Sequence, residues 1–230
     1  MRNPRVTEVI AEIRQHSAIA DSEARARVES RAAELGRALS TTEKYDLYGE
    51  SPPLAVKADV AELLYLLVRI GQSERIVEFG ASHGISTIYL AAALRDAGGG
   101  SLITTEILPG KVAATARNLA AAGLDDIVEI RTGDARQTLH NVGGPVDLVF
   151  LDGRNDLYLD VLQLLEPYLK QGAIIAADLS PDDPDLVPYV DHIHDEQGSY
   201  TTVRIPLDAG LEVSIWRPPR RGVKKPRTSA

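Results

Sequence analysis

The sequence contains no cysteine among its 230 residues. This absence excludes disulfides, thiolate nucleophiles and zinc-thiolate sites together, so any chemistry must come from carboxylates, histidine, lysine, tyrosine and the backbone. An excess of positive charge is also missing, since the formal net charge is -8 and the pI is about 5.2. That balance argues against nucleic-acid binding by bulk electrostatics and favours a small or locally bound substrate.

A long apolar stretch is absent from the N-terminus as well. Between Met1 and Arg14 the apolar residues are interrupted by Glu8 and Glu12, which fits neither a secretory signal nor a membrane span. We therefore expect a cytoplasmic protein that does not engage membranes. A chain of 230 residues is long enough for one domain with a full central sheet and helices on both faces.

Residues 1–56 are predicted to form a helical cap followed by a loop. The stretch 6–39 is rich in Ala, Glu and Arg, and Asp21 and Ser22 offer an N-cap that divides it into two helices. The apolar spacing of the first helix suits a packed cap on the domain, although a partner subunit would satisfy it equally. Glycine and prolines in residues 40–56 predict a loop.

Residues 57–217 alternate between short apolar runs, rich in β-branched residues, and amphipathic stretches of helical length. The predicted parallel strands are 75–79, 101–105, 127–131, 146–151 and 173–177. The predicted helices are 57–70, 85–97, 111–122, 136–142 and 157–169, with Gly98, Gly123 and Gly172 at helix C-caps. Two further strands, 200–205 and 211–216, form an antiparallel C-terminal hairpin.

These elements predict an α/β fold with a Rossmann-like, doubly wound, seven-stranded sheet that is mostly parallel, preceded by N-terminal helices. Ligands of such sheets bind at the carboxyl ends of the strands where the strand order reverses, and the strand 75–79 borders that point. Residues 218–230 form a basic, proline-containing tail that we expect to be disordered.

The strongest local signal is the turn that follows the strand 75–79. Gly80 and Gly84 allow close approach of a ligand to the backbone, and the following helix start offers free N–H groups. A dinucleotide fingerprint needs glycine at three positions, spaced G-x-G-x-x-G, but Ser82 and Ile85 occupy the second and third. A nicotinamide dehydrogenase is therefore disfavoured.

Two carboxylates follow the next strands at positions where a nucleotide would need them. Glu106 ends the second strand, where it can accept hydrogen bonds from both ribose hydroxyls. Gly133-Asp134-Ala135 follows the third strand. Asp134 is placed either as a hydrogen-bond acceptor or as the N-cap of a helix.

The segment from Glu78 to Ser86 resembles motif I of class I S-adenosylmethionine-dependent methyltransferases. Ser82 in place of the middle glycine, and the ending Gly84-Ile85-Ser86, are similar to O-methyltransferases of the catechol and caffeoyl-CoA type. The resemblance implies S-adenosylmethionine as the cofactor, with Asp134 at the adenine. The implied cofactor-binding residues are Glu78, Gly80, Ala81, Ser82, Gly84, Ser86, Glu106, Asp134, Ala135 and Asp152.

Asp152 and Asp178 end the fourth and fifth strands and should converge at the carboxyl edge. In the related O-methyltransferases these positions imply two aspartates of a Mg²⁺ site, which makes both residues candidate metal ligands and catalytic groups. The third ligand of that site, an Asn, falls at Leu179, which cannot coordinate. Asp182, Asp183 or water would have to complete the site, or it is lost, and two carboxylates that only line a pocket are an equal alternative.

The catalytic lysine that the resemblance implies falls at Asn155, which cannot act as a general base. His83 in the turn, or His192 and His194 after the fifth strand, are the candidate bases that remain, although each also suits an ordinary polar role. We therefore predict catalysis that depends little or not at all on a metal.

The resemblance implies O-methylation of a small hydroxylated aromatic acceptor by a homodimer. Two alternatives stay open. The basic tail would suit a methyltransferase of RNA or protein, although its low apolar content also fits a solvated tail. Loss of both the lysine and the asparagine would suit a non-catalytic binding subunit with a methyltransferase fold.

Overall fold

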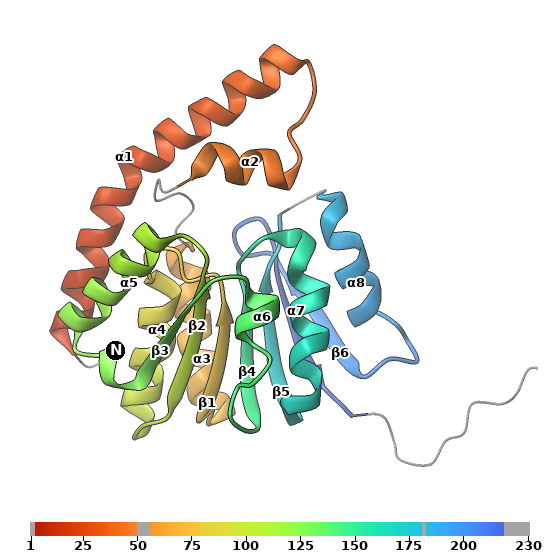
Figure 1. The fold of residues 1–230 in the computed structure, drawn as a ribbon. Coiled ribbons are helices and arrows are strands. Elements are labelled where there is room, and N and C mark those ends of the chain that lie inside the picture. Colours follow the sequence, from red (N-terminus) through yellow and green to blue (C-terminus); the bar gives the residue numbers. More distant parts are fainter. Residues whose placement is uncertain (1–2, 50–55, 181–182, 219–230) are drawn as a thin grey trace, which may run out of the picture.

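The computed structural model describes residues 3–49, 56–180 and 183–218. Its centre is a seven-stranded sheet of order β3-β2-β1-β4-β5-β7-β6, in which the pairings β5–β7 and β7–β6 are antiparallel and the others parallel (Figure 1). The strands are β1 Arg75–Phe79, β2 Ser101–Glu106, β3 Val128–Thr132, β4 Val146–Leu151, β5 Leu169–Asp178, β6 Tyr200–Ile205 and β7 Leu211–Trp216. This confirms the predicted doubly wound sheet, whose order reverses between β1 and β4.

Helices cover both faces of the sheet because its central strands are apolar on both sides. Ile76 and Phe150 pack with α3, α4 and α5, whereas Val77, Val149 and Leu151 pack with α6, α7 and α8. The helices are α3 Ala58–Gly71, α4 Ile85–Ala97, α5 Pro109–Ala122, α6 Ala135–Thr138, α7 Tyr158–Leu165 and α8 Val187–Ile193. No helix in the described part of the chain is long and apolar enough to cross a membrane.

The prediction of two helices divided at Asp21 and Ser22 is wrong. A single helix, α1 Pro4–Leu35, runs through both positions and ends at Gly36, whose φ is 63°. The reason is that no Gly or Pro occurs between Arg5 and Leu35, so helix propensity carries the chain past a possible cap. The second N-terminal helix is instead α2 Thr41–Tyr48, which begins with a capping box.

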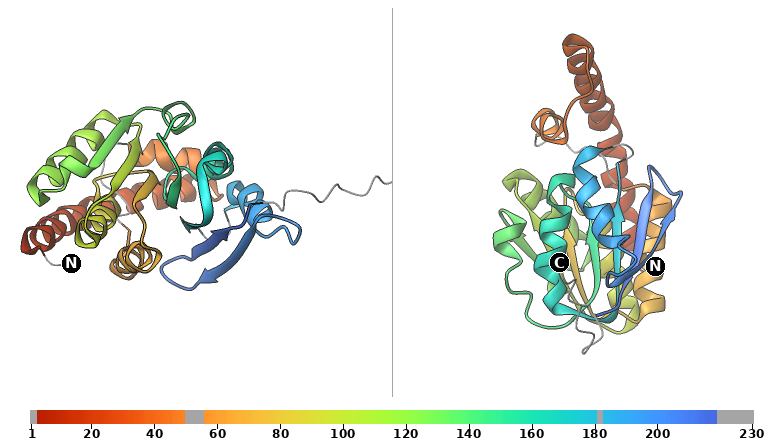
Figure 2. Two further views of the ribbon diagram at one scale, coloured as in Figure 1. Left: turned by 90° about the horizontal axis from the view of Figure 1, so that it is seen from below. Right: turned by 90° about the vertical axis from the view of Figure 1, so that its right-hand side faces the viewer.

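The first half of α1 packs on helices α4 and α5. Val6, Val9, Ile10 and Ile13 are buried there. Its second half rises beyond the sheet, and α2 lies beside it (Figures 1 and 2). The two helices thus form an arm above the carboxyl ends of the parallel strands.

Gly172 is not a helix C-cap as predicted, because α7 ends at Leu165 and Pro167 lies in the short turn that follows. β5 begins already at Leu169, and its pairing with β4 shifts register between Val146 and Leu148. Gly172 has a φ of 85° within this irregular stretch, a conformation that glycine adopts readily.

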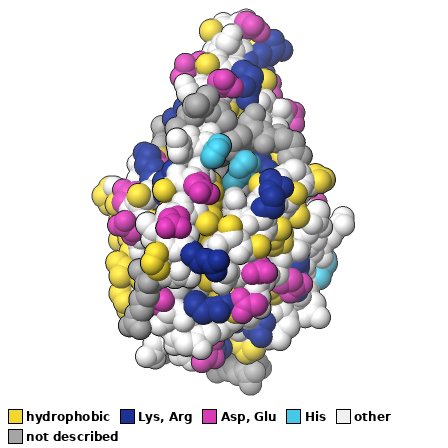
Figure 3. Space-filling model, turned by 90° about the vertical axis from the view of Figure 1, so that its left-hand side faces the viewer, with side chains coloured by type: hydrophobic (Ala, Val, Ile, Leu, Met, Phe, Trp, Pro, Cys, Tyr) yellow, Lys and Arg dark blue, Asp and Glu magenta, His cyan; other side chains and the backbone are white. Residues whose placement is uncertain are grey.

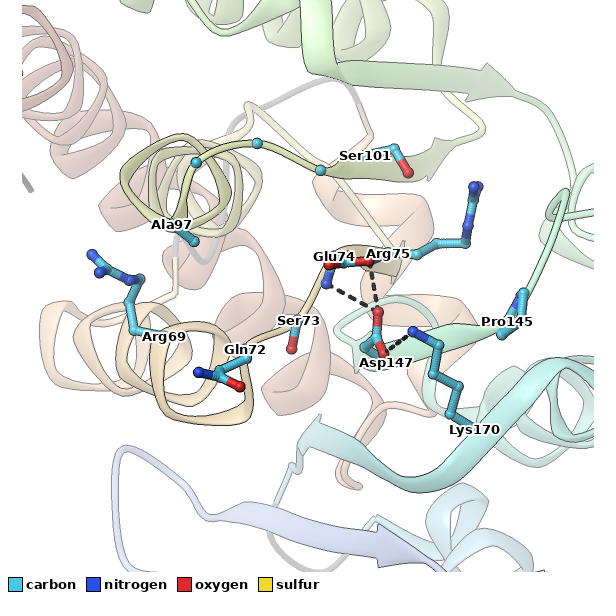
Figure 4. A pocket seen from close by; sticks show the side chains of 13 residues that line it. Arg69, Gln72, Ser73, Glu74, Arg75, Ala97, Ser101, Pro145, Asp147 and Lys170 are labelled. Carbon is cyan, nitrogen blue, oxygen red and sulfur yellow. Dashed lines mark hydrogen bonds and ion pairs between the residues drawn. The ribbon is translucent and has the colours of Figure 1, made fainter.

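At the amino ends of β1 and β4 lies an open hollow of about 830 Å³ (Figure 4). Asp147 sits beside it and joins the two strands: one carboxylate oxygen accepts the backbone N–H groups of Glu74 and Arg75 at 3.0 and 2.9 Å. The other oxygen is 2.6 Å from the Lys170 ammonium. Burial opposes ionisation, but Lys170 and the two N–H groups outweigh it and hold the pKa of Asp147 below its ordinary value.

We expect Asp147→Ala to lower the free energy of unfolding by about 1–3 kcal/mol, because two strand-end N–H groups lose their acceptor. Urea denaturation at neutral pH measures the change. The matched control is Asp125→Asn, which removes a charge from an exposed turn and should stay within about 0.5 kcal/mol of the wild type. Equal stabilities of the two variants would contradict a joining role for Asp147.

Candidate active site

The loop between β1 and α4 lies at the carboxyl edge and packs tightly against the loop after β4. Gly80 has a φ of 100°, and a Cβ there would lie 2.4 Å from the carbonyl oxygen of Asp152, so only glycine fits. The N–H groups of Gly80 and Ala81 both donate to the Thr105 carbonyl, at 3.2 and 2.9 Å. Gly84 begins α4 with a φ of 87°. The loop is thus packed closely against the end of β2 and the loop after β4.

Glu106 lies directly beside this loop, as its place at the end of β2 predicts. Its Oε2 accepts the backbone N–H of Ser82 at 3.0 Å, and its Oε1 accepts those of Ile107 and Leu108 at 2.8 and 3.0 Å. Ser82 adopts a φ of 47°, which is unusual for a residue with a Cβ, and the hydroxyl of Thr115 donates to its carbonyl at 2.7 Å. The loop and the carboxylate therefore form one fixed unit.

Glu78 is completely buried beneath the same loop. Its Oε2 accepts the hydroxyls of Thr87 and Thr104, each at 2.6 Å. Burial raises the pKa of Glu78, against the opposing effect of the neighbouring hydroxyl groups. Its Oε1 has no hydrogen-bond partner among the described residues, so a buried polar atom beside the loop is left for a ligand.

Asp134 caps α6, which is one of its two predicted roles. Its carboxylate accepts the backbone N–H of Arg136 at 2.9 Å and forms an ion pair with the guanidinium of that residue at 2.7 Å. The hydrogen bond with Arg136 holds the pKa of Asp134 below its ordinary value. Gly133 donates to the Glu106 carbonyl at 2.9 Å, which brings the end of β3 to the same edge, and Ala135 is buried there.

Asp152 and Asp178 come together as predicted, because β4 and β5 are parallel neighbours with Leu151 opposite Ala177. Burial raises the pKa of Asp178 to about 7, with the nearby carboxylate of Asp208 adding to the shift. Burial, followed by the charge of Asp178, raises the pKa of Asp152 well above its ordinary value. One edge of the sheet thus holds two neighbouring carboxyl groups whose pKa values are both raised.

Helix α2 covers this edge through Tyr45, whose hydroxyl donates to the Gly153 carbonyl at 2.6 Å. The Tyr45 side chain as a whole is exposed, but desolvation of its hydroxyl raises the pKa of Tyr45, and the carboxylates of Asp152 and Glu106 add to the effect. Tyr45 is therefore a hydrogen-bond donor rather than a base. Its position connects the α1–α2 arm to the loop that carries Asp152.

Comparisons with known proteins agree with this geometry. A family model described as a methyltransferase domain matches residues 77–178. The catechol O-methyltransferase of Mycobacterium tuberculosis is 37% identical over 131 residues, which cover 56% of this chain and 58% of that relative. Over this domain the chain is similar to O-methyltransferases. The catechol O-methyltransferase of Niastella koreensis is 34% identical over 131 residues, or 55% of this chain and 58% of the relative.

Among solved structures, the O-methyltransferase TomG of Streptomyces achromogenes, involved in tomaymycin synthesis and determined in complex with SAM, is 28% identical. Its TM-score is 0.63, and the match covers 77% of this chain and 86% of that protein. The chain spans less than two thirds of the length of both curated catechol O-methyltransferases that it matches.

The residues that the O-methyltransferase resemblance assigns to a metal do not form a suitable site. Leu179, at the implied asparagine ligand, is buried and offers no side-chain oxygen. Asn155 donates to Asp183 Oδ2 at 2.9 Å, and Asp183 Oδ1 accepts the N–H of Asp185 at 3.0 Å, so Asp183 already has partners. Asp182 lies outside the described residues. Within the described ranges, no cluster of three acidic or histidine side chains could hold a metal ion.

The three candidate histidines lie in different surroundings. His83 stays in the loop, where its carbonyl accepts the side-chain amide of Asn118 at 2.8 Å. The imidazole Nε2 of His192 lies 2.7 Å from the carboxylate of Glu166, just before β5. His194 contacts Glu212 at 3.1 Å. Of the three, the structure places only His83 in the loop beside Glu106.

Two residues near Asp178 were missed by reasoning from the sequence. Lys57 at the start of α3 forms an ion pair with Asp208 in the turn between β6 and β7. Both belong to segments far from Asp178 in the sequence, and neither lies in a recognisable motif. The only available signal was the position of the hairpin turn, because β7 pairs with β5 and brings that turn to the end of β5.

Proposed function

We propose that this chain binds S-adenosylmethionine and transfers its methyl group to a hydroxyl of a small aromatic acceptor. The observation that carries the proposal is Glu106, fixed beside the glycine loop at the point where the strand order reverses. The tightly packed Gly80 and the unpartnered Glu78 Oε1 fit a ligand held by backbone groups and buried polar atoms. When bound, the cofactor supplies an electrophilic methyl group on a positively charged sulfur.

The protein's own part in the reaction is to align the acceptor and remove its proton. A phenol has a pKa near ~10 and needs a base at neutral pH. Asp178 is the base we assign, because it lies at the carboxyl edge beside Asp152 and its pKa lies near neutrality. Asp178 would take the proton as the acceptor O–H bond breaks, and the acceptor oxygen would bond to the methyl carbon that S-adenosylmethionine supplies, with S-adenosylhomocysteine as the leaving group.

Isothermal titration with S-adenosylmethionine, S-adenosylhomocysteine and NAD tests the cofactor assignment. We expect micromolar binding of the first two and none of NAD. Turnover is then measured on a panel of catechols and phenols. Binding without turnover would support the non-catalytic alternative, and absence of adenosyl-ligand binding would overturn the proposal.

The charges on the side of the molecule formed by α1 and α5 do not favour an RNA acceptor. Figure 3 shows Lys and Arg side chains interspersed with Asp and Glu on that face, rather than a continuous basic surface. We also propose that the enzyme acts in the cytoplasm. We further propose that it forms a homodimer, and light scattering of the full chain tests this oligomeric state.

Tyr45 should influence the acceptor more than the cofactor, because it connects α2 to the loop after β4. We expect Tyr45→Phe to raise the acceptor KM about fivefold, the equivalent of one hydrogen bond, with cofactor affinity changed by less than about twofold. The matched control is Tyr168→Phe, since Tyr168 makes the same kind of bond, 2.6 Å to the His140 carbonyl, away from the site. An unchanged KM in Tyr45→Phe would argue against α2 as a wall of the acceptor site.

A further inference from the structure

An ion pair at the end of β5 joins three segments that are distant in the sequence. Lys57 precedes α3, and its ammonium contacts the carboxylate of Asp208 in the β6–β7 turn. That turn is fastened to the strand carrying Asp178, because the N–H of Leu179 donates to the Gly210 carbonyl at 2.9 Å. The ammonium is therefore held beside the candidate catalytic edge by backbone structure as well as by charge.

The charges around Asp178 indicate what a cation contributes at this edge of the sheet. Burial and the neighbouring Asp208 both disfavour a negative charge on Asp178, and Lys57 favours it. Tyr158, which packs against the same strand end, donates its hydroxyl to the Asp178 carbonyl at 2.7 Å and brings no charge. Arg154, which also lies near this edge, is paired with Asp156, and Lys57 supplies positive charge beside Asp178.

We propose that Lys57 takes the electrostatic place of a divalent cation in this enzyme and stabilises the acceptor phenolate. This rests on the proposed function. The donor set for a metal is incomplete at Leu179, whereas the Lys57 side chain is 58% exposed and remains accessible to an acceptor oxygen. Asp208 is then a positioning residue that holds the ammonium. An ammonium beside a phenolate favours the ionised acceptor, which is the same effect that a metal would have.

The alternative is a surface ion pair that only fastens the hairpin, which would contribute little. Lys57→Met removes the charge and keeps most of the side-chain length, whereas Lys57→Arg keeps the charge. Lys170→Met is the matched control, because Lys170 forms an ion pair with Asp147 at the opposite edge of the sheet. All four proteins are first titrated with S-adenosylhomocysteine, whose affinity should be the same within about twofold.

The probes for the acceptor are 4-nitrophenol and 4-nitrocatechol, whose ionised forms are distinguished by visible absorbance. With saturating S-adenosylhomocysteine, we expect the wild type, Lys57→Arg and Lys170→Met to bind the phenolate at least tenfold more tightly than Lys57→Met does. Equal phenolate affinity in Lys57→Met, or no phenolate binding by the wild type, would overturn the proposal.

Electron paramagnetic resonance with MnCl₂ tests the metal directly and needs no acceptor. We expect no saturable Mn²⁺ binding by the wild type. Saturable binding that is lost in Asp152→Asn would overturn the inference while leaving the proposed methyl transfer standing. Failure of S-adenosylhomocysteine to bind any of the four proteins would instead overturn the proposed function itself.

Discussion

Replacing Glu106 with alanine is expected to weaken S-adenosylmethionine binding by about 100-fold or more. Two ribose hydroxyls donating to one carboxylate contribute about 1.5–3 kcal/mol each, and every 1.4 kcal/mol is a tenfold change in affinity. The substitution also removes the acceptor of the Ser82 N–H, so the loop loses one of its fixed contacts. Isothermal titration with the cofactor and its demethylated product measures the loss.

Two further variants separate the ribose interaction from a general effect on folding. Glu106→Gln keeps one carbonyl oxygen and should fall between the wild type and Glu106→Ala. Glu74→Ala removes an exposed glutamate at the opposite edge of the sheet and should bind the cofactor like the wild type. If Glu106→Ala binds within about threefold of the wild type while remaining folded, the carboxylate is not the ribose acceptor.

Much of the fold could be predicted because its elements carry strong local signals. The strand Arg75–Phe79, the helix Ile85–Ala97 and both hairpin strands have the predicted bounds, since apolar runs and glycine caps mark them clearly. The errors occurred where such signals were ambiguous. A possible cap at Asp21 did not interrupt a stretch of high helix propensity, and Gly172 lies in an irregular stretch of β5 rather than at a helix end.

In the candidate site, too, some residues could be predicted from the sequence and others could not. Gly80, Glu106, Asp152 and Asp178 follow parallel strands, so the topology alone brings them to one edge. Contacts made by Tyr45 and by the Lys57–Asp208 pair depend on how the arm and the hairpin pack onto the sheet. No spacing in the sequence encodes such contacts, and only the three-dimensional structure reveals them.

Asp178→Asn is expected to lower kcat by about 100- to 10,000-fold, the usual contribution of a general base. Cofactor affinity should change little, because Asp178 is not part of the loop that holds Glu106. Asparagine keeps the size of the side chain but cannot accept the proton. Single-turnover measurements on an acceptor from the phenol panel give the rate, and a variant that retains full activity would remove Asp178 from the mechanism.

The pH dependence follows from the raised pKa of Asp178. Only the ionised carboxylate can take the acceptor proton, so kcat/KM of the wild type should rise with pH and level off above a midpoint near 7. The residual activity of Asp178→Asn should lack this rise. Lys57 lowers the pKa of Asp178, so the midpoint in Lys57→Met should move to higher pH.

The pH dependence of the unfolding free energy gives a second measure of the ionisation of Asp178, without any acceptor. The pKa of Asp178 is raised from 3.8 to about 7 on folding, so the folded protein holds this proton more tightly than the unfolded chain does. The stabilisation from the neutral carboxyl is complete below about pH 4 and is lost as the pH rises to about 7. Asp178→Asn, which cannot ionise, should therefore show a smaller loss of unfolding free energy across that range. Parallel curves for the wild type and the variant would mean that Asp178 ionises normally in the folded protein, and would leave the edge without a base poised near neutrality.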